Sequence, residues 1–439
     1  MSVPRRRFLA GSGLAIAFSG SVDALFRPAA AAAAAGAGDA HGYGPLVPDP
    51  DGLLDLPAGF SYRTISPQGS PIGDTVVPGA HDGMAVFRGR RHGTWRLVRN
   101  HEQRGPDGRV AAPPELTYDP AAHGGTTTLE VSRDGELLGH HISLGGTFAN
   151  CAGGTTPWGT WLTCEETEGF AGETRSHGWV FEIDPADPRR NADPVPLKGL
   201  GRFWHEAVAI DPASRICYLT EDAKEPFGLL YRFLPDVTAK RYGAYRAGGL
   251  LQAMHVPGLP DLSLVQEAGT RFRNVRWVDV PDPEAASEST RMQVDPVTRG
   301  EKLESAWWGR NSAYFVTSFA RAANGSPAEH AGQVWRYDPR LRTLELELVF
   351  KPGGRYDSPD NITVSPYGGG VVLAEDGDGE IFLVGVTREG RPFALARNAL
   401  NDSEMAGVAF SPDGRTLFAN RYTPGVTFAI TGPWHRLPR

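Results

Sequence analysis

The fold of this chain is decided by Trp161-Leu162-Thr163-Cys164-Glu165-Glu166, an apolar run that ends in two carboxylates. Other segments repeat the plan, with apolar residues that lead into a polar, mostly acidic or amide cluster. They are Trp95–Glu102, Cys217–Asp222, Ala313–Ser318, Val371–Asp376 and Thr416–Asn420. Recurrence at this scale is typical of stacked supersecondary units. Each unit would deliver polar side chains at the same strand end, so the pattern predicts a ring with an anionic rim. Such a rim is a candidate site for hard cations, which take oxygen ligands.

The neighbours of each run complete a repeating unit. A second strand that begins with Gly follows most runs, as in Gly332–Asp338, and a short strand that begins with a polar residue precedes each run, as in His205–Val208. Three strands in six copies, with a less legible outer strand, predict an all-β fold, a six-bladed β-propeller. Few and short helices are expected because no long segment has a 3.6-residue period. The alternatives are an open sandwich or two unrelated β domains, which the sixfold recurrence disfavours.

The predicted propeller spans residues 41–439. The copies are unevenly spaced, so we expect loop insertions, the longest at about residues 235–303. Residues 1–40 are excluded from the fold because Arg5-Arg6-Arg7-Phe8-Leu9 and the alanine-rich stretch 29–35 resemble a twin-arginine export signal with its cleavage region. The alternative is a disordered basic leader. We therefore expect the twin-arginine machinery as a partner and a periplasmic or extracellular location.

Composition limits the classes of partner. The formal net charge is −7 and the pI is about 6.0, which gives no sign of the clustered basic surface that nucleic acid requires. No apolar run is long enough to span a bilayer. We expect a monomer that acts on a small molecule.

The chain has three cysteines, and one of them differs from the others. Cys164 and Cys217 lie inside apolar runs, where a thiol behaves as a small buried hydrophobe; whether they pair stays open. Cys151 lies in the glycine-rich stretch Asn150–Gly159, at the rim end of a strand. A thiolate there is a candidate ligand, and it selects softer metals than calcium, such as iron or zinc.

These segments resemble a known family. The stretch Asn150–Glu166 is similar to the central motif of the PhoX family of alkaline phosphatases. Asn100-His101-Glu102 and Gly201–Ala207 match two further motifs of that family, and Ser403–Trp434 resembles its last blade. The resemblance covers most of the chain from about residue 50.

The resemblance implies a six-bladed propeller that hydrolyses phosphate monoesters and leaves the cell by the twin-arginine route. It implies two Fe³⁺ ions bridged by the Cys151 thiolate, an oxo group and three Ca²⁺ ions. The nucleophile would be a metal-bound oxo or hydroxo species, in keeping with the absence of a Gly-x-Ser-x-Gly elbow. Glu206 and Glu304 would bind iron or calcium. The remaining candidate metal ligands are Glu102, Glu165, Glu166, Asp222, Asp360, Glu375 and Glu404.

One departure from the family affects the expected phosphate site. Long members carry Arg-Pro-Glu-Trp, in which the arginine contacts phosphate, whereas this chain has Lys302-Leu303-Glu304-Ser305. A lysine is a point charge that cannot grip two phosphate oxygens bidentately. Lys302 and Arg310 are the candidate catalytic cations, and Arg291 is a further one.

Other interpretations remain open at this stage. Acidic residues at strand ends are often solvated, and His101 and His205 fit packing or support better than ligation because each precedes a glutamate in a strand of alternating faces. A calcium-dependent lactonase, a phosphodiesterase and a non-catalytic calcium-stabilised binding propeller are the competing functions. Cys151 argues against the last, because a structural calcium site has no use for a thiolate.

Overall fold

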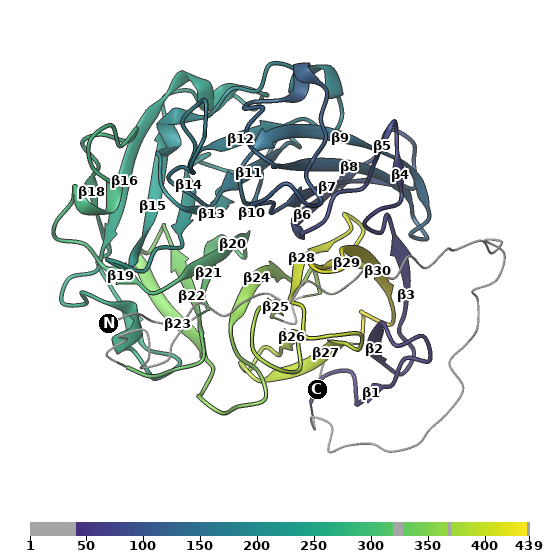
Figure 1. The fold of residues 1–439 in the computed structure, drawn as a ribbon. Helices are drawn as coiled ribbons and strands as arrows, with labels where there is room; N and C mark the ends of the chain where they lie inside the picture. Colours follow the sequence, from purple (N-terminus) through teal and green to yellow (C-terminus); the bar gives the residue numbers. More distant parts are fainter. Residues whose placement is uncertain (1–40, 319–327, 368–369, 437–439) are drawn as a thin grey trace, which may run out of the picture. The chain divides into compact units, whose positions relative to one another are not determined.

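The computed structural model describes residues 41–318, 328–367 and 370–436. Within them, antiparallel sheets follow one another around a ring (Figure 1). We number the sheets as blades. Blade 1 contains β6 (His81–Arg88), β7 (Thr94–His101), β8 (Gly124–Ser132) and β9 (Leu137–Thr147). Blade 2 contains β10 (Asn150–Thr155), β11 (Trp161–Glu165) and β12 (Val180–Ile183).

Blades 3 and 4 carry additional strands. Blade 3 contains β13 (His205–Ile210), β14 (Cys217–Glu221), β15 (Gly228–Pro235), β16 (Gly249–His255) and β18 (Arg276–Asp279), and β19 (Arg299–Gly300) pairs with β15. Blade 4 contains β20 (Leu303–Gly309), β21 (Ser312–Thr317), β22 (Gln333–Asp338), β23 (Thr343–Val349) and β17 (Arg271–Phe272). The stretch 235–303, expected as an insert, thus supplies outer strands to both blades.

The first strands of the described chain complete the last two blades. Blade 5 contains β24 (Pro359–Val364), β25 (Val371–Glu375), β26 (Phe382–Val386), β27 (Pro392–Asn398), β2 (Leu54–Pro57) and β1 (Leu46–Val47). Blade 6 contains β28 (Met405–Phe410), β29 (Thr416–Arg421), β30 (Val426–Thr431) and β3 (Ser61–Ile65). Figure 1 shows purple β3 beside yellow β30, and Ser61 pairs with Thr431. This pairing joins the two ends of the ring by backbone hydrogen bonds.

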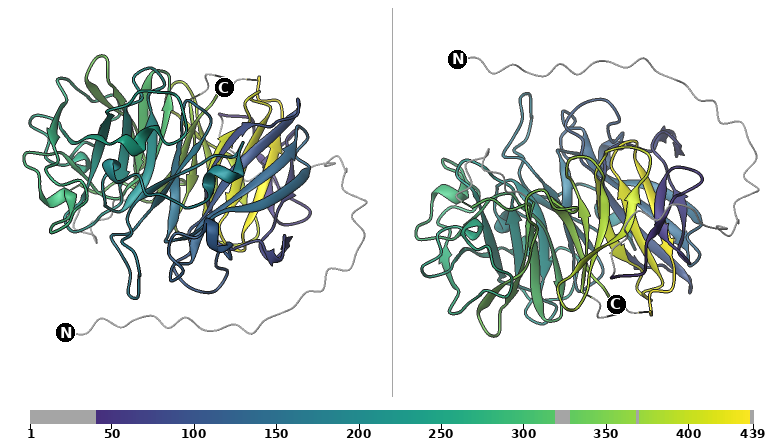
Figure 2. Two further views of the ribbon diagram at one scale, coloured as in Figure 1. Left: turned by 90° about the horizontal axis from the view of Figure 1, so that it is seen from above. Right: turned by 90° about the horizontal axis from the view of Figure 1, so that it is seen from below.

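The remaining elements are small. β4 (Pro71–Ile72) and β5 (Thr75–Val76) form a short hairpin. The helices of the described residues are 3₁₀ turns of three or four residues: η1 (Pro114–Leu116), η2 (Pro188–Asn191), η3 (Lys198–Leu200), η4 (Ala244–Ala247), η5 (Leu262–Leu264) and η6 (Thr290–Met292). The predicted all-β, six-bladed propeller with few short helices is confirmed. Seen from the side, the strands run between the two faces of the ring (Figure 2).

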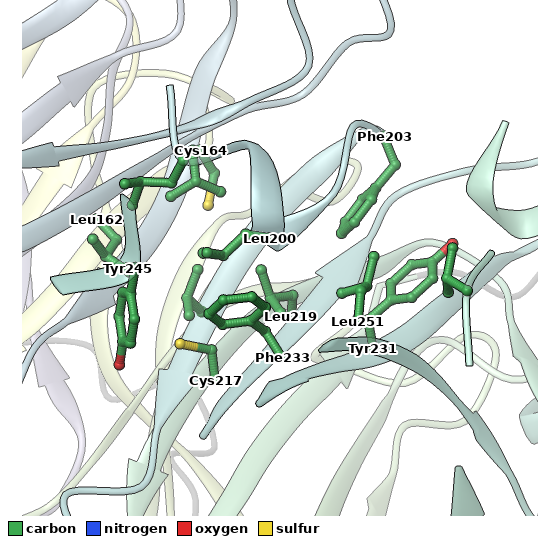
Figure 3. Close-up of a cluster of buried hydrophobic side chains, with 14 of the residues drawn as sticks. Leu162, Cys164, Leu200, Phe203, Cys217, Leu219, Tyr231, Phe233, Tyr245 and Leu251 are labelled. Carbon is green, nitrogen blue, oxygen red and sulfur yellow. The ribbon is translucent and has the colours of Figure 1, made fainter. Parts of the chain in front are cut away.

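Apolar side chains between neighbouring blades form the core. The contact of blade 2 with blade 3 buries Cys164 and Cys217 among leucine and aromatic side chains (Figure 3). Both residues are fully buried, and no disulfide joins the cysteines. Their thiols therefore pack as small apolar groups. No helix of the described residues has the length and apolar character needed to cross a membrane.

Candidate metal and active site

Six strands line the axis of the ring, and each begins with an irregularity. β6, β10, β13, β20, β24 and β28 contact one another in a closed circle. In each, the pairing with the following strand shifts register near the start. A bulge of this kind bends the strand and re-aims a side chain, and bulges are common beside active sites. The repeated bulge therefore directs one side chain from each blade toward the axis.

Two sets of side chains meet at this end of the blades. One set occupies the second position of an axial strand, or in blade 6 the position directly before it, and its members are Asp82, Cys151, Glu206, Glu304, Asp360 and Glu404. The other set directly follows the second strands of blades 1, 2, 3 and 5, and its members are Glu102, Glu166, Asp222 and Asp376. Because both sets repeat in register, the blades bring residues more than 300 positions apart into one cluster.

Ligand atoms in this cluster form four groups, and within each group they lie within 4.8 Å of one another. The groups are Cys151–Glu166–Glu206, Asp82–Glu102–Glu404, Glu206–Glu304–Asp360 and Asp360–Asp376–Glu404. Shared members link them into one continuous array, which we call the axial cluster. It contains seven of the ten metal ligands predicted from the sequence.

The axial cluster carries more negative charge than its surroundings neutralise. Burial, followed by repulsion from neighbouring carboxylates, raises the pKa of Glu206 and of Asp360 well above the ordinary range. The same causes raise the pKa of Asp82, Glu166 and Glu404. Buried carboxylates are ordinarily paired or coordinate metals. The donor set therefore fits several hard cations.

Cys151 gives one end of the axial cluster a different character. Its side chain is 4% exposed, and its Sγ donates to the carbonyl oxygen of His205 over 3.2 Å. Burial, together with the nearby Glu206 and Glu166 carboxylates, raises the pKa of the thiol well above its usual value. Only a strong local cation would favour the thiolate in this place. The group Cys151–Glu166–Glu206 therefore fits a softer metal than the all-oxygen groups do.

Lys302 and Asp222 extend the cluster toward blades 3 and 4. The Lys302 Nζ lies 2.7 Å from Glu304 Oε1 and 3.8 Å from Asp222 Oδ2. Burial opposes its charge, but the carboxylates of Glu304 and Asp222 outweigh burial and raise the pKa of Lys302. Asp222 Oδ1 is buried and has no hydrogen-bond partner among the described residues. That atom is available to a cation.

Two predicted carboxylates turn away from the axis. Glu165 Oε2 accepts from the backbone N–H groups of Gly178 and Trp179 over 2.9 and 3.0 Å, and its Oε1 lies 2.6 Å from His177 Nδ1. Glu375 has the corresponding place in blade 5, where its Oε2 accepts from the Phe382 N–H over 2.9 Å. Both residues end a second strand, one position before a cluster residue, and strand alternation points them to the opposite side. The structure does not bring them into the axial cluster.

The neighbouring residues Glu165 and Glu166 should therefore respond differently to substitution. We expect Glu165→Ala to lower the free energy of unfolding by about 3–5 kcal/mol, because it leaves the buried N–H groups of Gly178 and Trp179 without an acceptor. Metal content should stay unchanged. Glu166→Ala should lower metal content and leave the metal-free fold intact. Denaturant titration and metal analysis of both variants provide the check. Loss of metal in the Glu165 variant at unchanged stability would contradict this assignment.

Two other predicted cations also lie outside the cluster. Arg310 occupies the turn between β20 and β21, at the end of β20 opposite to Glu304, so the structure does not bring it to the site. Arg291 Nη1 is held 3.0 Å from both Glu168 and Glu221. It ties the 235–303 stretch to the rim and is already neutralised there.

Side-chain amides fix the axial strands to one another. Asn100 Nδ2 donates to the carbonyl oxygens of Cys151 and Ala152 over 2.8 and 2.7 Å. Asn420, in the matching position of blade 6, donates to the carbonyl oxygen of Asp82 over 2.5 Å. His101 and His205 support the backbone, with ring nitrogens 2.8 Å from Gly79 O and 2.9 Å from Gly201 O.

Glycine in the Cys151 stretch has a steric cause. A Cβ on Gly154 would lie 1.8 Å from the carbonyl oxygen of Val208 in blade 3. A side chain at this position would force β10 away from β13 and spread the ligand atoms. Glycine is therefore required where two axial strands approach closely.

The prediction from sequence omitted three residues of the site. Asp82 and Asp376 stand at the same repeat positions as the predicted ligands, so aligning the copies by their first strands finds Asp82 and aligning them by their second strands finds Asp376. Arg104 joins Glu102 and Glu166, with its Nη2 2.6 Å from Glu102 Oε1. It follows the second strand of its blade in a loop, and no repeat pattern marks it.

The fold and site together define a β-propeller with a buried carboxylate and thiol cluster on its axis, which is the arrangement of a candidate metalloenzyme. The family model of alkaline phosphatase PhoX matches residues 41–140 and 136–425. The chain belongs to the PhoX family of alkaline phosphatases and is accordingly a phosphatase. This confirms the resemblance and the enzyme class expected from the motifs. No curated protein matches the chain significantly in sequence.

A solved structure of a PhoX protein supports the fold. A structure of Pseudomonas fluorescens PhoX in complex with vanadate, a transition state analogue, superposes with a TM-score of 0.66 at 18% identity, over 87% of this chain and 96% of that chain. A Xanthomonas campestris gluconolactonase gives a TM-score of 0.44 at 12% identity, over 89% of this chain and 98% of that chain. The PQQ domain of a Coprinopsis cinerea pyranose dehydrogenase gives a TM-score of 0.41 at 11% identity, over 88% of this chain and 98% of that chain.

Proposed function

We propose that this phosphatase hydrolyses phosphate monoesters at the axial cluster, with iron and calcium as its resident metals. The observation that carries the proposal is the position of the Cys151 thiol within 4.8 Å of Glu166 and Glu206 ligand atoms, in continuity with all-oxygen groups. Such a mixture of donors fits a softer ion beside hard ones. Family membership supports metal dependence.

Donor type supports iron at the group that contains the Cys151 thiol. Cys151, Glu166 and Glu206 would hold one iron, and the all-oxygen group Glu206–Glu304–Asp360 would hold the second iron that family membership leads us to expect. The groups built on Asp82 and Asp376 offer only oxygen and would hold calcium. Metal ions at such sites lower the pKa of bound water and neutralise charge on the attacking and leaving oxygens of phosphoryl transfer. The proposed metal content is two Fe³⁺ and three Ca²⁺ ions, as the resemblance to the PhoX family implies.

Lys302 would supply a fixed positive charge beside the reacting phosphate. Its Nζ donates to Ser318 Oγ over 3.2 Å and to Glu304 over 2.7 Å, and Ser318 Oγ donates to Glu304 Oε1 over 2.5 Å. These contacts hold the ammonium group in one place before substrate arrives. A preorganised charge of this kind stabilises the transition state without reorganisation.

Export belongs to the proposal as well. The arginines and the alanine-rich stretch that motivate a twin-arginine signal lie in residues 1–40, outside the described residues. We propose that this segment directs the folded protein to the periplasm or the exterior, where it acts as a monomer on small phosphate esters. The twin-arginine route carries folded proteins, so metals bound in the cytoplasm would travel with the chain.

A substrate panel tests the proposed reaction. Protein loaded with iron and calcium is assayed on phosphomonoesters, phosphodiesters and lactones, with protein stripped by chelation as control. We expect hydrolysis of monoesters that is lost on chelation and regained when both metals return. A loaded protein that cleaves lactones or diesters, and no monoester, would refute the proposal and favour the lactonase or phosphodiesterase alternative.

A further inference from the structure

Arg104 is a second cation at the axial cluster, and it lies on the solvent side. Its Nη2 donates to Glu102 Oε1 over 2.6 Å and also contacts Glu166 Oε2. The Arg104 side chain is 44% exposed, whereas those of Glu102 and Glu166 are 13% and 11% exposed. The guanidinium therefore covers two carboxylates that are themselves largely buried, and its other face meets solvent.

The two carboxylates that Arg104 joins belong to different ligand groups. Glu102 lies with Asp82 and Glu404, and Glu166 lies with Cys151 and Glu206. Arg104 contacts Oε1 of Glu102 and Oε2 of Glu166, so the other oxygen of each carboxylate is available to a cation, whose charge would repel the guanidinium. The guanidinium would then lie beside metal cations at the exposed edge of the cluster, and its Nη1 would keep the Glu166 carbonyl oxygen at 3.4 Å. An anion that bridges the metals and the guanidinium resolves this repulsion.

Arg104 and Lys302 differ in what they can do for such an anion. Lys302 has a side chain only 20% exposed and is engaged by Glu304 and Ser318. Its ammonium is a point charge, whereas the guanidinium presents parallel N–H donors that match two phosphate oxygens. Lys302 suits a fixed internal charge, and Arg104 suits direct capture of a ligand from solvent.

We infer that Arg104 grips the phosphoryl group of the substrate with two hydrogen bonds and selects terminal, dianionic phosphate groups. A monoester offers three unesterified oxygens, so two can face the guanidinium while another faces the metals. A diester offers only two, with one negative charge, and cannot satisfy both. This inference rests on the proposed function, since it assigns a phosphate-binding residue to the same site.

Binding of inorganic phosphate tests the inference without reliance on turnover. The variants are Arg104→Gln and Arg104→Lys in the metal-loaded protein, with Arg133→Gln as the matched control. Arg133 is 42% exposed and donates through two nitrogens to Asp413, but it lies away from the cluster. The measurements are the phosphate dissociation constant by calorimetry, the bound metal, and kcat and KM for a monoester and a diester.

We expect Arg104→Gln to weaken phosphate binding about 10- to 100-fold, as loss of charged hydrogen bonds does, with metal content unchanged. The monoester KM should rise more than that of the diester, and Arg104→Lys should restore part of the phosphate affinity. A phosphate dissociation constant within twofold of wild type in Arg104→Gln, or a parallel loss of metal, would overturn the inference. Arg104-dependent phosphate binding in a wild type that hydrolyses no monoester would support the inference and refute the proposed function.

Discussion

Cys151→Ala is expected to remove iron from the protein and to abolish phosphatase activity. The thiol is the one sulfur donor of the described axial cluster, and its removal leaves Glu166 and Glu206 as an all-carboxylate pair. Loss of an outer partner of a metal ligand costs about 10- to 100-fold in affinity or activity, so loss of a ligand should exceed that range. Elemental analysis of protein from an export-competent host, with kcat measured on the same samples, provides the test.

Cys164→Ala is the matched control for this experiment. Cys164 is also buried in blade 2, among the apolar side chains between blades 2 and 3, and it belongs to none of the four ligand groups. Its substitution should cost some stability and leave iron in place. Iron content equal to wild type in Cys151→Ala would show that the thiol is not a ligand, and the carboxylates would then support only a calcium-based function.

Removal of each metal ion should lower the melting temperature by an amount on the order of 10 °C. Ligands that bind only the folded state add about 3–4 kcal/mol for each site filled 100- to 1,000-fold above its dissociation constant, and each kcal/mol corresponds to a few degrees in a large domain. Stripping them also leaves the buried carboxylates to repel one another. Calorimetry before and after chelation, and after calcium and iron are restored separately, measures the contribution of each ion.

The metal-free protein should also become less stable as pH rises. Burial and the neighbouring Glu304 raise the pKa of Asp222 from 3.8 to about 7. The pKa values of Glu206 and Asp360 are also raised, by burial and by neighbouring carboxylates. A carboxyl whose pKa is higher in the folded state stabilises the fold fully below its unfolded pKa. That stability is lost as pH rises toward and through the folded pKa, because the unfolded chain releases the proton first.

The stabilising contribution of Asp222 is therefore lost between about pH 4 and pH 7. Bound cations favour the ionised carboxylates and remove this dependence. We expect the melting temperature of chelated protein to fall between pH 5 and pH 8 relative to that of loaded protein, so that contributions common to both forms cancel. If the difference in melting temperature between loaded and chelated protein stays constant or narrows as pH rises, the axial cluster does not carry uncompensated acidic groups.

The sequence by itself determined the repeat and therefore the fold. Alternation of apolar and polar residues is a local property, and six copies of it leave little choice but a ring of small sheets. The repeat also predicted that acidic side chains would lie together at one end of the strands, and that Cys151 would lie at the same end. Glu206, Glu304, Asp360 and Glu404 were predicted as ligands from the resemblance to the PhoX family, and each lies at or directly before the start of the first strand of its blade.

Tertiary structure alone decided which polar residues face the axis. Glu165 and Glu166 are adjacent and chemically alike, yet the pleat and the bulge turn one toward backbone donors and the other toward Cys151. The sequence pattern also does not show which arginine reaches the site. A turn places Arg310 at the far end of β20, and a loop brings Arg104 to the axial cluster. Pairing of β3 with β30 closes the ring across the whole chain. Local pattern encodes strands and their ends, whereas bulges, loops and long-range closure depend on packing between blades.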